Sequence, residues 1–243
     1  MRAADTPHRS KILRVVFTAA EADPLIKVGG LGDVAGSLPA QLQKTSQLDG
    51  KKIHIDIRLV LPYHLLISPR FREQKPVAEF TIPTRKTQLQ ARVFYTKFNN
   101  INVYLIDGKP ISKSNSVYSR DSKVDGDKFA FFSLACLKLI EILDFKPHIL
   151  HANDWHTALT IYAQSLNRSQ KSNSNYPATL ITLHNLPFMG TGTENSLKKY
   201  GIPPSKHQDL PEWSRQLPLP MGLSTADAIV AVSPTYAREI QTE

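Results

Sequence analysis

Short, continuous apolar segments recur along the chain and predict buried β-strands. Unbroken apolar runs, unlike strict alternation of apolar and polar positions, are typical of parallel strands that are covered on both faces. The segments are Ile12–Thr18, Ile53–Leu61, Arg92–Tyr95, Val103–Ile106, His148–His151, Thr179–Leu183 and Ala228–Val232.

Apolar positions between several of these segments repeat with the spacing of an α-helix. Val34, Leu38 and Leu42 recur every four residues, and Trp155–Leu166 is a second helical segment. Pro234–Ile240 follows a serine that suits a helix N-cap. The strongest helical pattern begins at Asp127 and places on one stripe Phe129, Phe132, Cys136, Leu139, Ile140 and Leu143.

Strands that alternate with helices predict an α/β fold with a doubly wound, mostly parallel sheet. The segment Pro76–Ile106 resembles antiparallel hairpins inserted among the crossovers. Ser112–Asp127 and Ser165–Tyr176 are predicted to be loops, and residues 1–11 a flexible tail. Neither loop is long enough for a linker between domains, so we expect residues 1–243 to form a single domain.

Composition and charge exclude several classes of protein. The 243 residues include 30 Lys and Arg against 21 Asp and Glu, which gives 30 − 21 = +9, but the positive charge is scattered and forms no nucleic-acid-binding stripe. The single cysteine, Cys136, excludes an internal disulfide and a multi-cysteine zinc site. Arg14 interrupts the first apolar segment, which favours a strand over a signal peptide, and no apolar run is long enough to span a membrane.

Candidate binding residues follow the predicted strands, because ligands of a doubly wound sheet bind beyond the carboxyl ends of its strands. Gly29, Gly30 and Gly32 follow the first strand and precede a helix, an arrangement that lets backbone N–H groups approach an anion. Gly30–Ala35 also fits the pattern G-x-G-x-x-A of nicotinamide sites. The second strand ends without the acidic residue that such sites need, and a turn chosen only for tight packing is a further alternative.

Asp154 and Trp155 follow the strand that ends near His151. They could be a helix N-cap and a core residue, or a carboxylate and an indole that face a sugar. A metal site made by His151, Asp154 and His156 is a weaker alternative, since this spacing does not by itself make the three side chains converge.

His184 and Asn185 follow the next strand, in a turn that contains proline and glycine. Two polar side chains at this edge of the sheet are typical of binding groups, although a histidine that merely satisfies its own loop is the alternative. No G-x-S-x-G elbow is present, which argues against an α/β-hydrolase.

Together and in this order, these segments resemble the family of bacterial glycogen synthases and plant starch synthases. The glycine-rich motif K-x-G-G-L-x-D-V is highly specific, and the resemblance covers essentially the whole chain. The matching segments are Lys27–Val34, Lys128–Ser133, His151–Thr157, Thr182–Leu186 and Ser233–Ile240.

The resemblance implies the N-terminal, Rossmann-like domain of a GT-B fold, in which two such domains face each other across a cleft. It also implies retaining transfer of glucose from ADP-glucose, or UDP-glucose in some members, to the non-reducing end of an α-1,4-glucan such as glycogen or starch. No metal or other cofactor, nucleic acid or membrane partner is implied. A bacterial member would be cytoplasmic and a plant member plastidial.

The same resemblance assigns roles to nine residues. Lys27 would contact the donor's phosphates, and Gly29, Gly30 and Asp33 belong to the turn that lies against the nucleotide sugar. Three residues, Lys27, Asp154 and His184, are the catalytic candidates, with Asp154 near the transferred glucose or the acceptor and His184 near the reacting carbon of the donor glucose. The supporting residues are Trp155 beside Asp154, Asn185 beside His184, and Tyr118 as an acceptor contact.

Three features depart from the family. Lys128 stands where members commonly have arginine, which would reduce a bidentate contact to a point charge. Glu212–Pro220 replaces a glycine- and asparagine-containing segment, which puts acceptor contacts there in doubt. Members also continue into a second domain that carries most donor contacts, so we expect this chain to be the N-terminal half and to have little turnover alone. A non-catalytic glucan-binding or regulatory protein derived from this half is the alternative.

Overall fold

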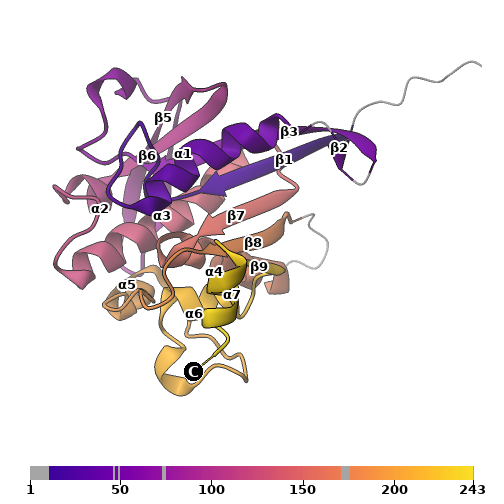
Figure 1. The fold of residues 1–243 in the computed structure, drawn as a ribbon. Helices are drawn as coiled ribbons and strands as arrows, with labels where there is room; N and C mark the ends of the chain where they lie inside the picture. The colour runs from indigo at the N-terminus through magenta and orange to yellow at the C-terminus, as the bar shows by residue number, and fades with distance from the viewer. Residues whose placement is uncertain (1–10, 46, 49, 73–74, 171–175, 243) are drawn as a thin grey trace, which may run out of the picture.

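A central β-sheet organises the chain in the computed structural model, which describes residues 11–45, 47–48, 50–72, 75–170 and 176–242 (Figure 1). Within these residues the sheet has nine strands in the order β4-β5-β6-β3-β1-β7-β8-β9, and β2 pairs with β3 outside this path. The strands are β1 (Lys11–Thr18), β2 (Gln47–Leu48), β3 (Lys51–Pro62), β4 (Ala78–Pro83), β5 (Gln88–Phe98), β6 (Ile101–Gly108), β7 (Ile149–Asn153), β8 (Ala178–Leu183) and β9 (Ala228–Ala231).

The sheet confirms the predicted fold class. From β6 through β3, β1, β7 and β8 to β9, each neighbouring pair is parallel. β4, β5 and β6 form the expected antiparallel insertion, and β6 also pairs in parallel with β3, so the insertion continues the main sheet. Every apolar segment predicted to be a strand contributes one.

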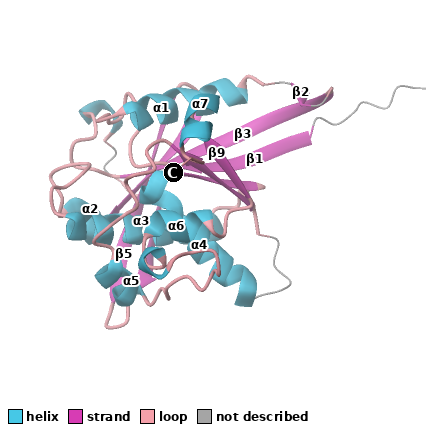
Figure 2. Cartoon of the chain, turned by 60° about the horizontal axis from the view of Figure 1, so that its bottom comes forward, coloured by secondary structure: helices cyan, strands magenta, loops and turns pink. Residues whose placement is uncertain are grey.

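Helices cover both faces of the sheet, with α1 and α7 on one side and α3, α4 and α6 on the other (Figure 2). Two single turns of 3₁₀-helix are η1 (Pro69–Phe71) and η2 (Glu212–Ser214). The α-helices are α1 (Gly30–Gln43), α2 (Lys109–Ser112), α3 (Ser122–Ile142), α4 (Asp154–Gln170), α5 (Glu194–Tyr200), α6 (Pro218–Leu223) and α7 (Pro234–Glu239).

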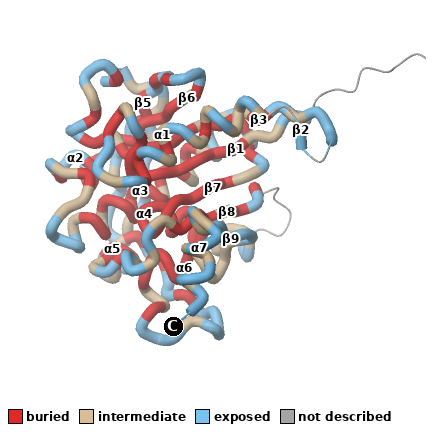
Figure 3. The backbone as a smooth tube through the Cα atoms, in the orientation of Figure 1, coloured by how far each residue is buried: buried red, intermediate tan, exposed pale blue. Residues whose placement is uncertain are grey.

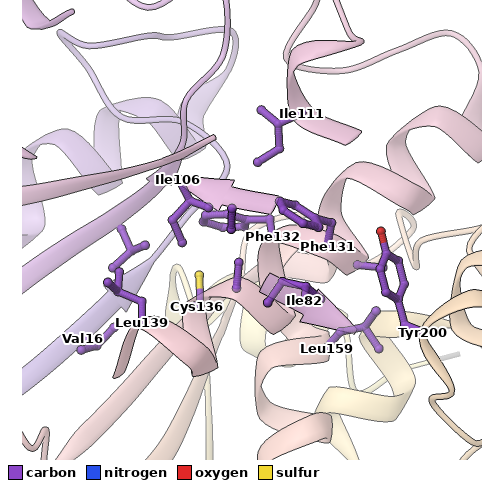
Figure 4. Packing of buried hydrophobic residues seen from close by; sticks show 14 of the residues in the cluster. Val16, Ile82, Ile106, Ile111, Phe131, Phe132, Cys136, Leu139, Leu159 and Tyr200 are labelled. Atoms are coloured by element: carbon purple, nitrogen blue, oxygen red, sulfur yellow. The ribbon is translucent and has the colours of Figure 1, made fainter. Parts of the chain in front are cut away.

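Among the described residues, three apolar clusters fill the space between the sheet and these helices, and buried residues are concentrated along the central strands (Figure 3). Successive side chains of a strand point to opposite faces. Val16 therefore packs with the α3 residues Phe132 and Cys136 (Figure 4), whereas Val15 and Phe17 belong to the cluster that includes α1. The free thiol of Cys136 is buried, and its burial raises its pKa well above the ordinary value.

Several boundaries differ from the prediction. α3 begins at Ser122, five residues before the expected Asp127, because the Asp121 carboxylate accepts a hydrogen bond from the backbone N–H of Lys123 and caps the helix. The predicted loop Ser112–Asp127 is therefore wrong over its last residues. The loop Ser165–Tyr176 is wrong where α4 continues to Gln170, and its residues 171–175 lie outside the described part.

The N-terminal prediction also needs a correction. Lys11, assigned to a flexible tail, begins β1, where it pairs in register with Ile53 of β3. Residues 1–10 lie outside the described residues. In the part of the chain that the structure describes, no helix is long and apolar enough to cross a membrane.

The Gly36→Ala variant should be strongly destabilised. α1 passes the turn at Asp23 so closely that a Cβ at position 36 would collide with the backbone oxygen of Asp23. We expect the free energy of unfolding to fall by about 2–3 kcal/mol, as is usual for overpacking against backbone. Gly30→Ala is the matched control in the same helix, because no atom lies within 4 Å of the added Cβ. Equal midpoints for the two variants in urea unfolding would contradict this packing.

Candidate active site

A cavity of about 740 Å³ lies at the edge of the sheet where β1, β7 and β8 end. It brings together most of the residues predicted from the sequence, although these lie in segments far apart in the chain. Seven of the nine candidates line it: Gly29, Gly30, Tyr118, Asp154, Trp155, His184 and Asn185.

Asp154 joins β7 directly to α4. Its backbone adopts a left-handed conformation with φ of 54°, which is uncommon for a residue other than glycine and is found at functional sites. The carboxylate accepts hydrogen bonds from the backbone N–H groups of His184, at 2.7 Å, and Asn185, at 3.3 Å. Asp154 therefore fixes the two residues that follow β8. This role goes beyond that of a helix N-cap, which was one of the alternatives that the sequence left open.

Burial raises the pKa of Asp154, while its hydrogen bond from His184 N–H acts in the opposite direction. A carboxylate that is only 4% exposed and already holds two backbone N–H groups is fixed in position. Such a group can orient a sugar hydroxyl or stabilise positive charge without having to reorganise first.

The His184 ring is held by Asn153. The Asn153 amide nitrogen donates to the backbone oxygen of Thr18, at 3.0 Å, so its oxygen faces His184 Nε2, at 2.9 Å. This contact favours the tautomer with the proton on Nε2 and leaves Nδ1 as an acceptor. Burial lowers the pKa of His184, although Asp154 and Glu21 partly oppose the shift, and the imidazole is neutral at neutral pH.

The glycine turn is held by Glu21, a residue that the sequence analysis did not single out. Its buried carboxylate accepts hydrogen bonds from the backbone N–H groups of Val28 and Gly29 and from the Tyr118 hydroxyl, the last at 2.8 Å. The N–H groups of Val28 and Gly29 are therefore already bound to Glu21 and are not available to a ligand. In the described part of the chain, the N–H groups of Gly30 and Leu31 have no acceptor, and both residues line the cavity at the start of α1.

Lys27 and Asp33 do not line the cavity. They form an exposed ion pair with 2.6 Å between Lys27 Nζ and Asp33 Oδ1. The hydrogen bond to Asp33 raises the pKa of Lys27, so the lysine stays charged. Their predicted contacts with a nucleotide sugar remain predictions.

Aromatic rings form the wall beneath the cavity. Trp155 is 8% exposed, and its ring centroid lies 5.1 Å from that of Phe129 and 4.4 Å from that of His156. The Tyr118 ring lies 4.9 Å from His156 on the other side. Trp155 thus belongs both to the core and to the cavity wall. The sequence had offered these two roles, a core residue and an indole that faces a ligand, as alternatives.

Lys128 is fully buried and has an internal role. Its ammonium group lies 2.7 Å from Asp125 Oδ1 and donates to the backbone oxygens of Ser116, at 3.2 Å, and Val117, at 2.6 Å. The lysine thereby fixes the segment that precedes Tyr118. The prediction that Lys128 is a point-charge substitute for a bidentate ligand contact finds no support in this position, because Lys128 is not among the lining residues.

The metal alternative is not supported by the geometry. His151 is engaged elsewhere, with its Nε2 2.7 Å from the Thr182 hydroxyl and its ring against Phe17. Among the described residues, no group of three or more His, Cys, Asp or Glu side chains is arranged to hold a metal ion. That the chain needs no metal or cofactor remains a prediction.

Comparison with known proteins identifies the family. The model of the starch synthase catalytic domain matches residues 14–243. The chain belongs to this family. Glycogen synthases of Natranaerobius thermophilus and Vibrio parahaemolyticus are 36% and 34% identical to it, over 94% and 95% of this chain and 46% and 47% of their own lengths.

A solved structure agrees with this assignment. The catalytic domain of starch synthase IV from Arabidopsis thaliana, bound to ADP and acarbose, matches with a TM-score of 0.79 and 25% identity. The match covers 96% of this chain and 47% of that chain. The glycosyltransferase family and the GT-B type of domain predicted from the sequence are thus confirmed, and the chain spans about half the length of the curated relatives it matches.

The segment Glu212–Pro220, which was predicted to depart from the family pattern, contacts the cavity wall at its end, where the Leu219 N–H donates to the backbone oxygen of the lining residue Met189, at 3.1 Å. Within Glu212–Pro220, the Trp213 side chain is 67% exposed, and Pro218–Pro220 begins the buried helix α6. No residue of this segment lines the cavity. In the same family context, G-x-G-x-x-A is part of the synthase motif, which leaves the nicotinamide alternative without support.

Proposed function

We propose that this chain is the N-terminal half of a glycogen or starch synthase that transfers glucose from ADP-glucose, with retention, to the non-reducing end of an α-1,4-glucan. The observation that carries the proposal is the fixed pair of Asp154 and His184 in a cavity that the glycine turn also lines. The relatives' names and the neighbour bound to ADP and acarbose support it.

The residue types suit this chemistry. Departure of a nucleoside diphosphate leaves negative charge on its phosphate, and N–H groups aimed at such charge lower the barrier by several kcal/mol, about 3 kcal/mol for one donor in a comparable site. The unoccupied N–H groups of Gly30 and Leu31, with Lys27 nearby in the chain, would serve this purpose. Asp154 and neutral His184 would orient the sugar hydroxyls as the reacting carbon gains positive character.

The relatives are about twice as long as this chain. We therefore expect the 243-residue chain alone to show little or no turnover. The preference for ADP-glucose over UDP-glucose, and a place in the cytoplasm or plastid stroma, remain predictions.

Glucan binding can be tested by migration in native gels with and without embedded glycogen. We expect retardation that maltoheptaose reverses, and we expect Asp154→Asn to weaken it about tenfold, equivalent to about 1.4 kcal/mol. Asparagine tolerates the left-handed backbone at this position and keeps an acceptor for His184 N–H, so the variant removes the charge and preserves the fold.

Asp144→Ala is the matched control, because it removes an aspartate from an exposed position that does not line the cavity. Near-UV circular dichroism confirms that each variant is folded. Unretarded migration of the unchanged chain would overturn the assignment of a glucan surface to this half, and equal retardation of Asp154→Asn and Asp144→Ala would remove Asp154 from that surface.

A further inference from the structure

A cluster of basic side chains lies at the opposite edge of the sheet from the candidate active site. Arg14 of β1 and the segment before β7, which contains Lys146 and His148, line a second cavity of about 720 Å³. The cavity lies where β7 and β8 begin, so no residue of the synthase site contributes to it. Nothing in the proposed transferase chemistry uses these side chains.

Two N–H donors face each other inside this cluster. The backbone N–H of Arg14 donates to His148 Nδ1, at 3.0 Å, so Nδ1 is an acceptor and the proton of the neutral ring is on Nε2. The Arg14 guanidinium nitrogen Nη2 lies 3.2 Å from this same Nε2. Both groups are donors, and no other acceptor for either is found among the described residues, so the oxygen atoms of an anion bound beside them would accept from both.

The Arg14 guanidinium group is fixed through its Nε atom, and Arg14 lines the cavity in which a ligand would bind. Its Nε donates to the backbone oxygen of Lys146, at 2.9 Å, which fixes the plane of the guanidinium group. Among the described residues, Nη1 has no acceptor and the Lys146 ammonium group forms no ion pair. A guanidinium group held in this way is suited to bidentate binding of an oxyanion.

The charge around the cluster is positive. Glu141 is the acidic residue in the cavity wall, and its carboxylate is paired with Lys138 Nζ, at 2.8 Å. Partial burial and the charges of Arg14 and Lys11 lower the pKa of His148. An arriving anion therefore meets several unneutralised donors and no free carboxylate among the described lining residues.

We propose that Arg14, Lys146 and His148 bind the phosphate group of a small phosphorylated ligand, or inorganic phosphate itself. A phosphate dianion offers several acceptor oxygens, which match the guanidinium fork, the His148 Nε2–H and the lysine. The cavity exceeds the size of one phosphate and leaves room for the rest of a phosphorylated metabolite. The cluster is compact and forms no extended stripe, which disfavours a nucleic-acid backbone as the ligand.

The proposal can be tested by NMR titration of the 243-residue chain with inorganic phosphate at constant ionic strength, with chloride as the replaced anion. We expect the His148 ring signals to shift and saturate, and the pKa of His148 measured in phosphate to be higher than that measured in chloride. Arg14→Gln and Lys146→Gln should each weaken phosphate binding, Arg14→Gln by tenfold or more. Lys146→Gln keeps the test decisive if Arg14→Gln does not fold, because the Lys146 side chain makes no ion pair with any residue that the structure describes.

Lys86→Gln is the matched control, since it removes one positive charge from an exposed turn between β4 and β5. Phosphate binding should be unchanged in this variant. Shifts that rise linearly without saturation would overturn the proposal, and so would equal weakening by Lys86→Gln and Lys146→Gln. A phosphorylated sugar that binds more tightly than inorganic phosphate would identify the ligand as a metabolite, whereas equal affinity would identify phosphate itself.

Discussion

Replacement of Glu21 by alanine is expected to lower the free energy of unfolding by about 3 kcal/mol, because it leaves three donors without their acceptor and each costs about 1–3 kcal/mol when buried. The donors are the N–H groups of Val28 and Gly29 and the Tyr118 hydroxyl. Water from the adjacent cavity offsets part of the loss. Urea unfolding measures the change, and hydrogen exchange of the Val28 and Gly29 amides should accelerate about a hundredfold.

Two further variants separate the charge of Glu21 from its shape. Glu21→Gln keeps one acceptor oxygen and should lose less stability than Glu21→Ala. A double-mutant cycle with Tyr118→Phe should give a coupling energy of about 1 kcal/mol, since the hydroxyl and the carboxylate are in direct contact. Glu79→Ala, at an exposed position of β4, is the control and should change stability by less than about 0.5 kcal/mol. Similar losses for Glu21→Ala and Glu79→Ala would contradict the role of Glu21.

The central strands β1, β6, β7 and β8 were predictable from the sequence because they are largely buried and mostly apolar. The start of α3 was not, because residues of its first turns that are buried, Asp125 and Gly126, are not apolar. Hydropathy periodicity cannot detect a buried face of this kind. Asp121, a residue type that is favoured at helix N-caps, was the local signal that could have moved the predicted start from Asp127 to Ser122.

The candidate site was predictable in part. The rule that ligands bind beyond strand ends led to Asp154 and His184, and the family motif added the glycine turn. Glu21 was missed because its importance depends on Tyr118, 97 positions later in the sequence, and on the turn folding back over it. Asn153 was missed for a similar reason, since its amide bridges His184 and the end of β1 only when β1 and β7 are paired.

The chain should lose stability steeply as the pH falls from about 6.5 to about 4. The upper value is the ordinary pKa of histidine, and the lower value is the pKa of His64 and of His151 in the folded chain. Burial lowers the pKa of His64 and of His151 to about 4 and that of His156 to about 3. In this pH range the unfolded chain binds protons that the folded chain does not bind, so the free energy of unfolding decreases as the pH falls. Well above pH 6.5, near pH 8, the three histidines are neutral in both states and contribute no slope.

The expected slope is large. Each proton bound only by the unfolded chain contributes about 1.4 kcal/mol per pH unit, so three histidines approach about 4 kcal/mol per pH unit near pH 5. Asp125 and Asp154 offset part of this loss, because burial raises their pKa values and the folded chain then binds protons more readily at these two carboxylates. Urea unfolding at intervals between pH 7.5 and pH 4.5 measures the slope.

Substitutions assign this slope to individual histidines. His64→Gln and His156→Gln should each reduce the slope by close to one proton, and glutamine can keep the contact that His64 Nε2 makes with the backbone oxygen of Ala20 at 3.0 Å. His207→Gln is the control, because its side chain is 43% exposed. A slope that stays the same in His64→Gln and His156→Gln, or that falls equally in His207→Gln, would show that the acid sensitivity arises elsewhere.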